Sequence, residues 1–261
     1  MIGAVSVVAL LAPVISPHGV YQMDLAHRFA RVGAHGHLLG TDNLGHDMLA
    51  QLIWGARPSL VIAFVPVLAG IAVGSVLGGA AAYLRGRPEA VIMRSLDIFL
   101  ALPPVLLAIA LAAVLGPGLE NIVIALSVVL IPPMARVVYQ QVVGIRSLLF
   151  VESARSIGAT DVRILLRHIF PNAMSTVLAY GASVAALTIV LGAGLSFIGL
   201  GIQPPQADWG RTINAGRDAL TKAPQVATLP GVGIFVLALG FNLISDGLRS
   251  PYGRRWVRPR L

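Results

Sequence analysis

Apolar positions fall in long unbroken runs along the chain rather than alternating with polar ones. Five runs are long enough, or nearly so, for a helix to cross a hydrocarbon core of roughly 30 Å at about 1.5 Å per residue. They are Ser59 to Tyr83, Leu96 to Leu115, Ile122 to Val138, Ala173 to Leu200, and Leu229 to Leu248. A sixth run, Ile2 to Ile15, is shorter and contains Pro13. We therefore predict an all-α integral membrane protein with about six transmembrane helices.

The composition supports this prediction and excludes some kinds of covalent and metal-binding chemistry. Hydrophobic residues make up 56% of the 261 residues and charged residues only 11%, whereas soluble domains carry about 25% charged residues. Lipid must therefore cover much of the surface. The chain has no cysteine, which excludes disulfides and thiolate metal sites.

The distribution of arginine predicts the orientation in a cell membrane, plasma or inner. Positive charge is concentrated on one set of loops and on the C-terminal tail, which the positive-inside rule places in the cytoplasm. Both termini then lie inside, which requires an even number of spans and favours counting the first run. That run either begins at the membrane edge or lacks residues of the natural chain. The expected domains are 1–15, a first transmembrane helix; 16–57, an extracytoplasmic loop; 58–247, the main membrane domain; and 248–261, a basic cytoplasmic tail.

The cytoplasmic segment from Val151 to Asn172 is the most informative stretch. Gly158 interrupts it, and Thr160 or Asp161 could cap a second helix. The pattern predicts two short helices joined at Gly158 outside the membrane, with Pro171 marking the return to lipid. One apolar stripe follows helical spacing through Val162, Leu165, Leu166 and Ile169. The pattern alone leaves two interpretations open, a simple connecting hairpin and a docking element for a soluble partner.

The spacing of Glu152, Ala154, Gly158 and Pro171 resembles the EAA loop of ABC importer permeases. Ser153 departs from the alanine usual there, and Ile169-Phe170-Pro171 departs from the usual isoleucine-x-leucine-proline. In that family the loop forms a coupling helix in a cleft of the ATP-hydrolysing subunit. The resemblance implies that the coupling positions are Glu152, Ala154, Gly158, Ala159, Asp161 and Pro171.

Further stretches resemble the C-type permeases of dipeptide and oligopeptide importers. They are His37 to Gly45 continuing through Leu52 to Arg57, then Ser95 to Pro104, Leu195 to Gly201, and Pro204 to Gly210. His46 departs from the usual arginine. The resemblance implies a type I permease core, alternating access and di- or oligopeptide substrates. It also implies four kinds of partner: a second permease subunit, ATP-binding subunits, an extracytoplasmic substrate-binding protein and surrounding lipid. It implies no nucleic-acid partner.

Several kinds of chemistry are missing from the sequence. No G-x-x-x-x-G-K-[ST] motif occurs, so the chain has no P-loop for ATP. No H-E-x-x-H or G-x-S-x-G motif appears either. We therefore expect a subunit that is not an enzyme, needs no cofactor, and depends on a partner for ATP hydrolysis.

Histidines are concentrated in the outward loop. His35 and His37 are close enough in sequence to share a metal ion, but the loop offers no cysteine, and histidine also serves as an ordinary polar loop residue. We expect no metal site. The loop holds five of the six histidines: His18, His27, His35, His37 and His46.

The middles of the predicted spans carry almost no charge. Asp97 lies near Arg94 at a cytoplasmic end, where a local ion pair is expected rather than a proton relay. The paired prolines Pro103-Pro104 and Pro132-Pro133 should kink their helices. Weakly polar residues either line a translocation path or join helices to one another: Ser127, Ser183, Thr188 and Asn242. Two alternatives remain, an ion-coupled secondary transporter of a small solute and a membrane scaffold that transports nothing.

Overall fold

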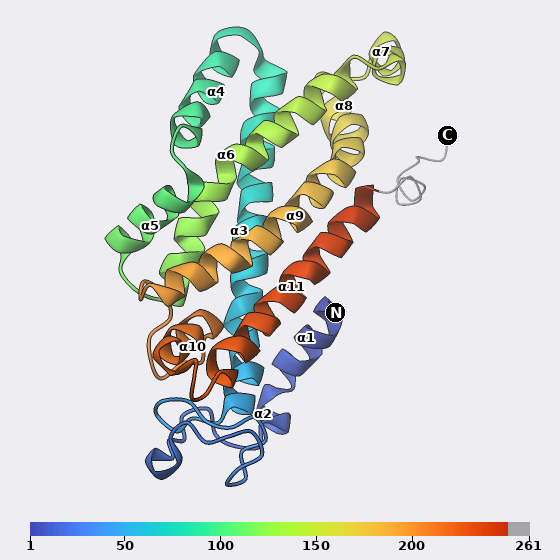
Figure 1. Cartoon of the computed structure of the whole chain (residues 1–261). Helices are drawn as coiled ribbons and strands as arrows, with labels where there is room; N and C mark the ends of the chain where they lie inside the picture. Colours follow the sequence, from blue (N-terminus) through green and yellow to red (C-terminus); the bar gives the residue numbers. More distant parts are fainter. Residues whose placement is uncertain (250–261) are drawn as a thin grey trace. The chain divides into compact units, whose positions relative to one another are not determined.

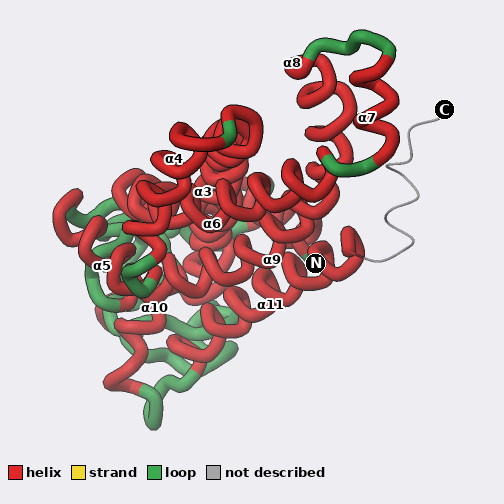
Figure 2. The backbone as a smooth tube through the Cα atoms, turned by 90° about the horizontal axis from the view of Figure 1, so that it is seen from above, coloured by secondary structure: helices red, strands yellow, loops and turns green. Residues whose placement is uncertain are grey.

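The computed structural model describes residues 1–249, which form helices and loops without a β-strand (Figure 2). Four helical runs are long and apolar enough to cross a membrane, or five if one bent pair counts as a span. The runs are α3 (Met48–Leu84), α6 (Leu119–Arg146), the continuous segment Asp161–Phe197 and α11 (Gln225–Arg249). The bent pair is α4 (Gly86–Leu100) and α5 (Pro104–Leu115). These elements confirm the predicted all-helical membrane fold.

The remaining elements of the described part of the chain include the three that make up the run Asp161–Phe197, and Figure 1 labels the α-helices. They are α1 (Ile2–Leu10), α2 (Ala12–Ile15), η1 (Leu25–His27), α7 (Leu149–Ser156), α8 (Asp161–Ile164), the π-helical segment η2 (Leu165–Ile169), α9 (Phe170–Phe197), α10 (Trp209–Gly216) and η3 (Arg217–Ala219). The basic tail predicted for 248–261 lies outside the described residues from position 250 onward.

The chain forms two compact units. Unit 1 contains Met1–Val65, Ala108–Leu126 and Ala185–Phe241. Unit 2 contains Pro66–Leu107, Ser127–Val184 and the chain from Asn242 onward. The long helices α3, α6, α9 and α11 each contribute residues to both units, and the packing inside each unit is described separately below.

The first predicted span, residues 1–15, folds as the two short helices α1 and α2. Neither reaches the 18 residues that mark a candidate span, so a sixth span stays a prediction. The Arg57 guanidinium donates to the last carbonyls of α1, through Nε to Ala9 O at 2.7 Å and Nη2 to Leu10 O at 3.3 Å. These bonds satisfy carbonyls that a helix end leaves without a partner.

Helix α3 begins at Met48, whereas the sequence predicts loop structure up to residue 57. Asp47 Oδ2 accepts a hydrogen bond from Ala50 N–H at 2.9 Å, which is the geometry of a helix N-cap. Met48 and Ala50 are fully buried in unit 1. Capping and burial therefore start the helix early, and it continues through Pro58 although proline donates no backbone hydrogen bond.

The two proline pairs behave differently. Pro103-Pro104 coincides with a break between α4 and α5, and the two helices are bent by 85° (Figure 1). This bend confirms the predicted kink. Pro132-Pro133 lies inside α6, and α6 continues through both residues.

Glycines allow α3 and α6 to pack closely within unit 2. Gly70, Gly74 and Gly78 follow one another at intervals of four residues on α3 and face α6. A Cβ at Gly78 would lie 2.2 Å from Ala135 O, and one at Gly74 would lie 2.8 Å from Ala135 N. Because the nearest atoms belong to the backbone of α6, only glycine fits at these contacts.

Asp97 forms an ion pair with a residue that the sequence did not indicate. Its carboxylate lies 2.8 Å from Arg136 Nη2, and the two side chains join α4 to α6 within unit 2. The prediction of a local pair with Arg94 was wrong, because Arg136 approaches from a different helix. The role as a structural anchor is unchanged.

The stretch Pro204–Gly210 leads into α10, a helix that the hydrophobic pattern did not predict. Asp208 Oδ1 accepts from Arg211 N–H at 2.7 Å and caps the helix. The buried Trp209 donates from Nε1 to Leu52 O at 3.1 Å. A Cβ at Gly210 would lie 2.3 Å from Ala193 O. Each of the last three residues of the stretch thus has a specific packing role in unit 1.

Asp208 provides a pH-dependent test of this arrangement. Burial raises the pKa of its carboxyl above the ordinary value of 3.8. The protonated form is therefore favoured in the fold, and stability is lost as the pH rises through the raised pKa. We expect Asp208→Asn, which keeps the cap, to raise the midpoint of thermal unfolding at pH 7 but not below about pH 4.

The matched control is Asp208→Ala, which removes both the cap and the charge. It should lower stability by about 0.5–2 kcal/mol below about pH 4, where only the cap is lost, and by less at pH 7, where removal of the buried charge offsets part of the loss. The measurement is the unfolding midpoint of the full chain in lipid nanodiscs. Equal losses for both variants at pH 7 would contradict the assignment of a buried, penalised charge to Asp208.

Candidate functional site

The turn between α7 and α8 carries most of the coupling positions predicted from the sequence. On α7, Val151 and Ala154 are 1% and 7% exposed and pack into a buried apolar cluster of unit 2. The other members of the cluster come from α3, α6 and the segment after the turn: Ala82, Val138, Val142, Ile164, Ile169 and Val177. One face of the short helix α7 is therefore fixed to the helices that precede and follow it.

Gly158 closes α7 in a left-handed conformation, with φ +85°. Gly158 N–H donates to Arg155 O at 3.0 Å, and Ala159 N–H donates to Ala154 O at 3.1 Å. This pair of bonds is a Schellman motif, which satisfies the free carbonyls at a helix C-terminus. The predicted break between two helices at Gly158 is confirmed, and the conformation explains why glycine stands there.

The second helix begins at Asp161, and Thr160 stands at the N-cap position, as one of the two predicted alternatives has it, but its side chain makes no cap hydrogen bond. The return to lipid at Pro171 stays a prediction, but the helix is not interrupted at this proline, because Asp161–Phe197 is one continuous helical run. The π-helical segment η2 lies just before Pro171. A π turn widens the helix and alters its bonding where proline can donate no hydrogen bond.

The predicted apolar stripe is also wrong in part. Val162 and Leu166 are 58% and 62% exposed, whereas Ile164 and Ile169 are buried. Ile164 and Ile169 are five residues apart, the spacing that a π turn places on one face. The five-residue spacing of these two isoleucines is visible in the sequence, but a pattern search that assumes a regular helix of 3.6 residues per turn does not place them on one face.

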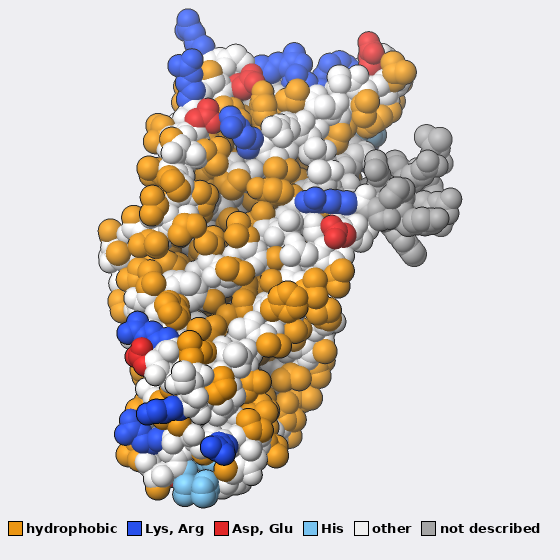
Figure 3. Space-filling view, viewed as in Figure 1, with side chains coloured by type: hydrophobic (Ala, Val, Ile, Leu, Met, Phe, Trp, Pro, Cys, Tyr) orange, Lys and Arg blue, Asp and Glu red, His pale blue; other side chains and the backbone are white. Residues whose placement is uncertain are grey.

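The outer face of the turn is exposed and mixed in character. Leu149 and Ile157 are 81% and 86% exposed. Arg155 Nη2 lies 3.3 Å from Asp161 Oδ1 and bridges the turn, with both side chains more than half exposed. Figure 3 shows Lys and Arg side chains around α4 and beside α7, with hydrophobic side chains also visible on α7. Large exposed apolar side chains bordered by charge are typical of a protein contact surface.

The predicted coupling residues divide into three groups. Glu152, Gly158 and Asp161 are exposed on the turn. Ala154 and Ala159 instead pack against the buried cluster. Pro171 lies at the start of α9, away from the turn itself. Sequence reasoning missed Val151 and Ile164, which anchor the turn from either side of Gly158.

The four predicted path residues differ in environment. Thr188 is buried in unit 1, while Ser127 and Ser183 are half-buried and Asn242 is exposed. A cavity of about 290 Å³ in unit 2 is lined by other residues, Ser175, Thr176, Ala179, Leu248 and Arg249. Beside it, Ser245 Oγ donates to Ala179 O at 2.7 Å and joins α11 to α9. This bond is an example of a polar residue joining two helices.

The chain is similar in sequence to known transport proteins. The family model described as "Binding-protein-dependent transport system inner membrane component" matches residues 70–258. The chain is 41% identical over 214 residues to the glutathione transport system permease protein GsiD of Pectobacterium atrosepticum, covering 82% of this chain and 71% of that protein. The same protein from Escherichia coli O157:H7 matches with the same identity and coverage.

Solved structures with the same fold are membrane subunits of transporters. One is an inward-facing structure of the MetNI methionine ABC transporter, with a TM-score of 0.63, 18% identity, and coverage of 77% of this chain and 97% of that one. Another is an amino acid ABC transporter, with a TM-score of 0.60, 19% identity, and coverage of 76% and 92%. At these identities the likeness shows the fold alone.

Proposed function

The chain belongs to the binding-protein-dependent inner membrane components, the permease subunits of ABC importers, and on that premise we propose that it passes di- or oligopeptides, including glutathione, across the membrane. The partner subunits, the orientation and the coupling residues are parts of the same proposal. The observation that carries the coupling part is the α7–α8 turn, whose inner face is anchored and whose outer face is exposed.

The turn is suited to transmit movement from a soluble subunit. Val151 and Ala154 hold α7 on the buried cluster, and Ile164 and Ile169 hold the following helix on the same cluster. A partner pressing on Leu149, Ile157 or Glu152 would therefore displace the whole cluster rather than bend a loose loop. Through this cluster the force would reach α6 and α9, which continue into the membrane.

In the proposed mechanism, ATP binding closes two partner ATPase subunits, and the turn follows that closure. The spans then reorient between outward-open and inward-open states. Such a shift occurs only if the partner binds one state more tightly than the other. The full assembly contains a second, similar permease, two ATP-binding sites on partner subunits and an extracytoplasmic substrate-binding protein that selects the cargo.

The proposed topology places the α7–α8 turn and both termini in the cytoplasm. Arginines on the turn and on α4 follow the positive-inside rule. In this topology the segment 16–47 and the α10 region face outward, where a substrate-binding protein can reach them. Residues 1–15 form a first span and 58–247 form the main membrane domain in the same proposal.

Peptide import is supported by the relatives, which are named as glutathione transport permeases at 41% identity. Weakly polar residues such as Ser127, Ser183, Thr188 and Asn242 are the proposed contacts for a peptide backbone along the path. The described spans contain few charged residues, which suits passage of a substrate without tight binding.

The test is uptake of labelled glutathione and of a labelled dipeptide into proteoliposomes containing the full complex and its binding protein. We expect uptake with ATP that persists when ion gradients are collapsed by ionophores. Uptake that survives without ATP and stops with the ionophore would instead support the ion-coupled secondary transporter. If the complex takes up another solute with ATP but neither glutathione nor the dipeptide, the peptide assignment would be refuted and the assignment as an ATP-driven importer would stand.

A further inference from the structure

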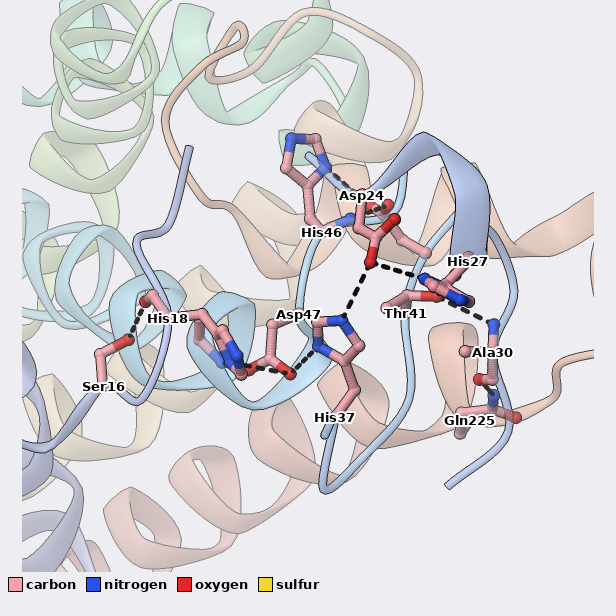
Figure 4. A network of polar contacts seen from close by, with 12 residues as sticks. Ser16, His18, Asp24, His27, Ala30, His37, Thr41, His46, Asp47 and Gln225 are labelled. Atoms are coloured by element: carbon pink, nitrogen blue, oxygen red, sulfur yellow. Dashed lines mark hydrogen bonds and ion pairs between the residues drawn. The ribbon is translucent and has the colours of Figure 1, made fainter. Parts of the chain in front are cut away.

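Three side chains that are far apart in sequence meet in unit 1, beside the start of α3 (Figure 4). His18 follows α2, His37 lies in the middle of the long loop, and Asp47 caps α3. One ligand atom from each residue lies within 4.8 Å of the others. The sequence indicated His35 as the neighbour of His37, but the fold places His18 there, with ring centroids 4.8 Å apart.

Both imidazoles approach the same carboxylate oxygen. His37 Nδ1 lies 2.9 Å and His18 Nδ1 lies 3.8 Å from Asp47 Oδ1. A tetrahedral zinc ion with bonds of about 2.1 Å separates its ligand atoms by about 3.4 Å. The two observed distances lie on either side of this value, and the three ligand atoms all lie within 4.8 Å of one another, so they must draw closer together to hold an ion.

The groups around the cluster are arranged to support a bound cation. Asp47 is only 2% exposed, and its second oxygen, Oδ2, is occupied by the Ala50 N–H, which fixes the direction of Oδ1. His37 Nε2, on the far side of the ring, lies 3.9 Å from Asp24 Oδ2. A carboxylate that is hydrogen-bonded to a ligand histidine is the usual outer support of a metal site. Asp24 Oδ2 lies on the correct side of the ring but beyond hydrogen-bond distance, and it is hydrogen-bonded to His27 Nδ1 at 2.8 Å.

One nitrogen in the cluster lacks a partner. His18 Nδ1 is buried and has no hydrogen-bond partner among residues 1–249. A buried polar atom without a partner carries a desolvation penalty that nothing in the fold offsets. A cation held between His18 Nδ1 and Asp47 Oδ1 would remove this penalty, since it satisfies the nitrogen lone pair and the carboxylate together.

We propose that His18, His37 and Asp47 bind one divalent transition-metal cation, with zinc as the reference ion, and that the ion ties the segment after α2 to the start of α3. Two imidazole ligands suit zinc and its neighbours, whereas calcium and magnesium prefer ligand sets made of oxygen atoms alone. Water completes the coordination. Because a ligand imidazole binds through a nitrogen that carries no proton, His37 would bind the ion through Nδ1 as the neutral tautomer with its proton on Nε2. The site is structural and does not depend on the identity of the transported substrate.

The experiment measures zinc bound to the full chain, purified with its accompanying subunits through a tag that contains no histidine. Zinc content per chain is determined after dialysis, together with the zinc-induced shift of the unfolding midpoint. We expect about one ion per chain and a raised midpoint for the wild type, because a ligand that binds only the folded state stabilises it. His18→Gln should lose both, with at least a tenfold weaker affinity.

His46→Gln is the matched control. His46 lies in the same loop but pairs with Asp42, at 2.9 Å, outside the cluster, so this variant should bind zinc as the wild type does. His18→Cys keeps a zinc ligand and should restore binding even if glutamine disturbs the loop. Equal zinc content in the wild type and His18→Gln would overturn the proposal. Absence of zinc from the wild type would do the same and would leave His37 and Asp47 as an ordinary hydrogen-bonded pair.

Discussion

Replacing Gly158 by glutamate is expected to leave the protein in the membrane but to deprive it of its ATP-hydrolysing partner. Gly158 has φ +85°, which an L-residue adopts at a cost of roughly 1–2 kcal/mol. The substitution also puts a charged side chain next to Ile157, on the outer face of the turn. Strain would loosen the end of α7, and the charge would interfere with the proposed dock, so ATP-dependent uptake should fall to background.

The measurement is the amount of ATPase subunit retained when the tagged permease is purified in mild detergent. Gly144→Glu serves as the control, because Gly144 is an exposed position of α6 in the same unit, where an added Cβ would meet no atom within 4 Å and φ is not positive. Gly158→Ala separates strain from charge and should show an intermediate loss. Full retention of the partner by Gly158→Glu would refute the coupling role of this glycine.

Gly78→Val is expected to cause the largest loss of folded protein. A Cβ at this position would meet Ala135 O at 2.2 Å and Tyr139 N at 2.9 Å. Both atoms belong to the backbone of α6, so no side chain can rotate away to make room. Overpacking of this kind typically costs about 1–3 kcal/mol and sometimes more. We expect little mature protein in the membrane and a clearly lowered unfolding midpoint for any that inserts.

Gly144→Ala is the control for this substitution. Alanine favours a helix over glycine by about 0.5–1 kcal/mol, and nothing lies within 4 Å of a Cβ at Gly144. Membrane levels should therefore match or exceed the wild type. Normal levels and stability for Gly78→Val would mean that α3 and α6 do not approach as closely as the structure indicates.

The spans were predictable because a membrane helix is encoded locally, in the length of an apolar run. The start of α3 was harder to predict from the sequence. Pro58 suggested a boundary, but the helix begins at Met48 because Asp47 caps it and its first residues are buried. Burial depends on partners elsewhere in the chain, which the local pattern does not reveal.

The functional residues were predictable only where the local sequence pattern identifies them. Gly158 could be identified from its position between two helical patterns, and its left-handed conformation accounts for it. Ile164 and Ile169 were missed because their alignment requires a π turn. His18 and His37 come together only through the path of a long loop without regular structure, so their meeting could not be read from spacing.

This permease is expected to work only with ATPase subunits that bind its α7–α8 turn. The most direct test is purification of the wild-type chain from its native membranes in mild detergent, followed by identification and counting of the subunits that accompany it. We predict recovery of a second permease and of P-loop ATPases in stoichiometric amounts. Repeated recovery of this chain alone would contradict that dependence and would favour a transporter that works without ATP.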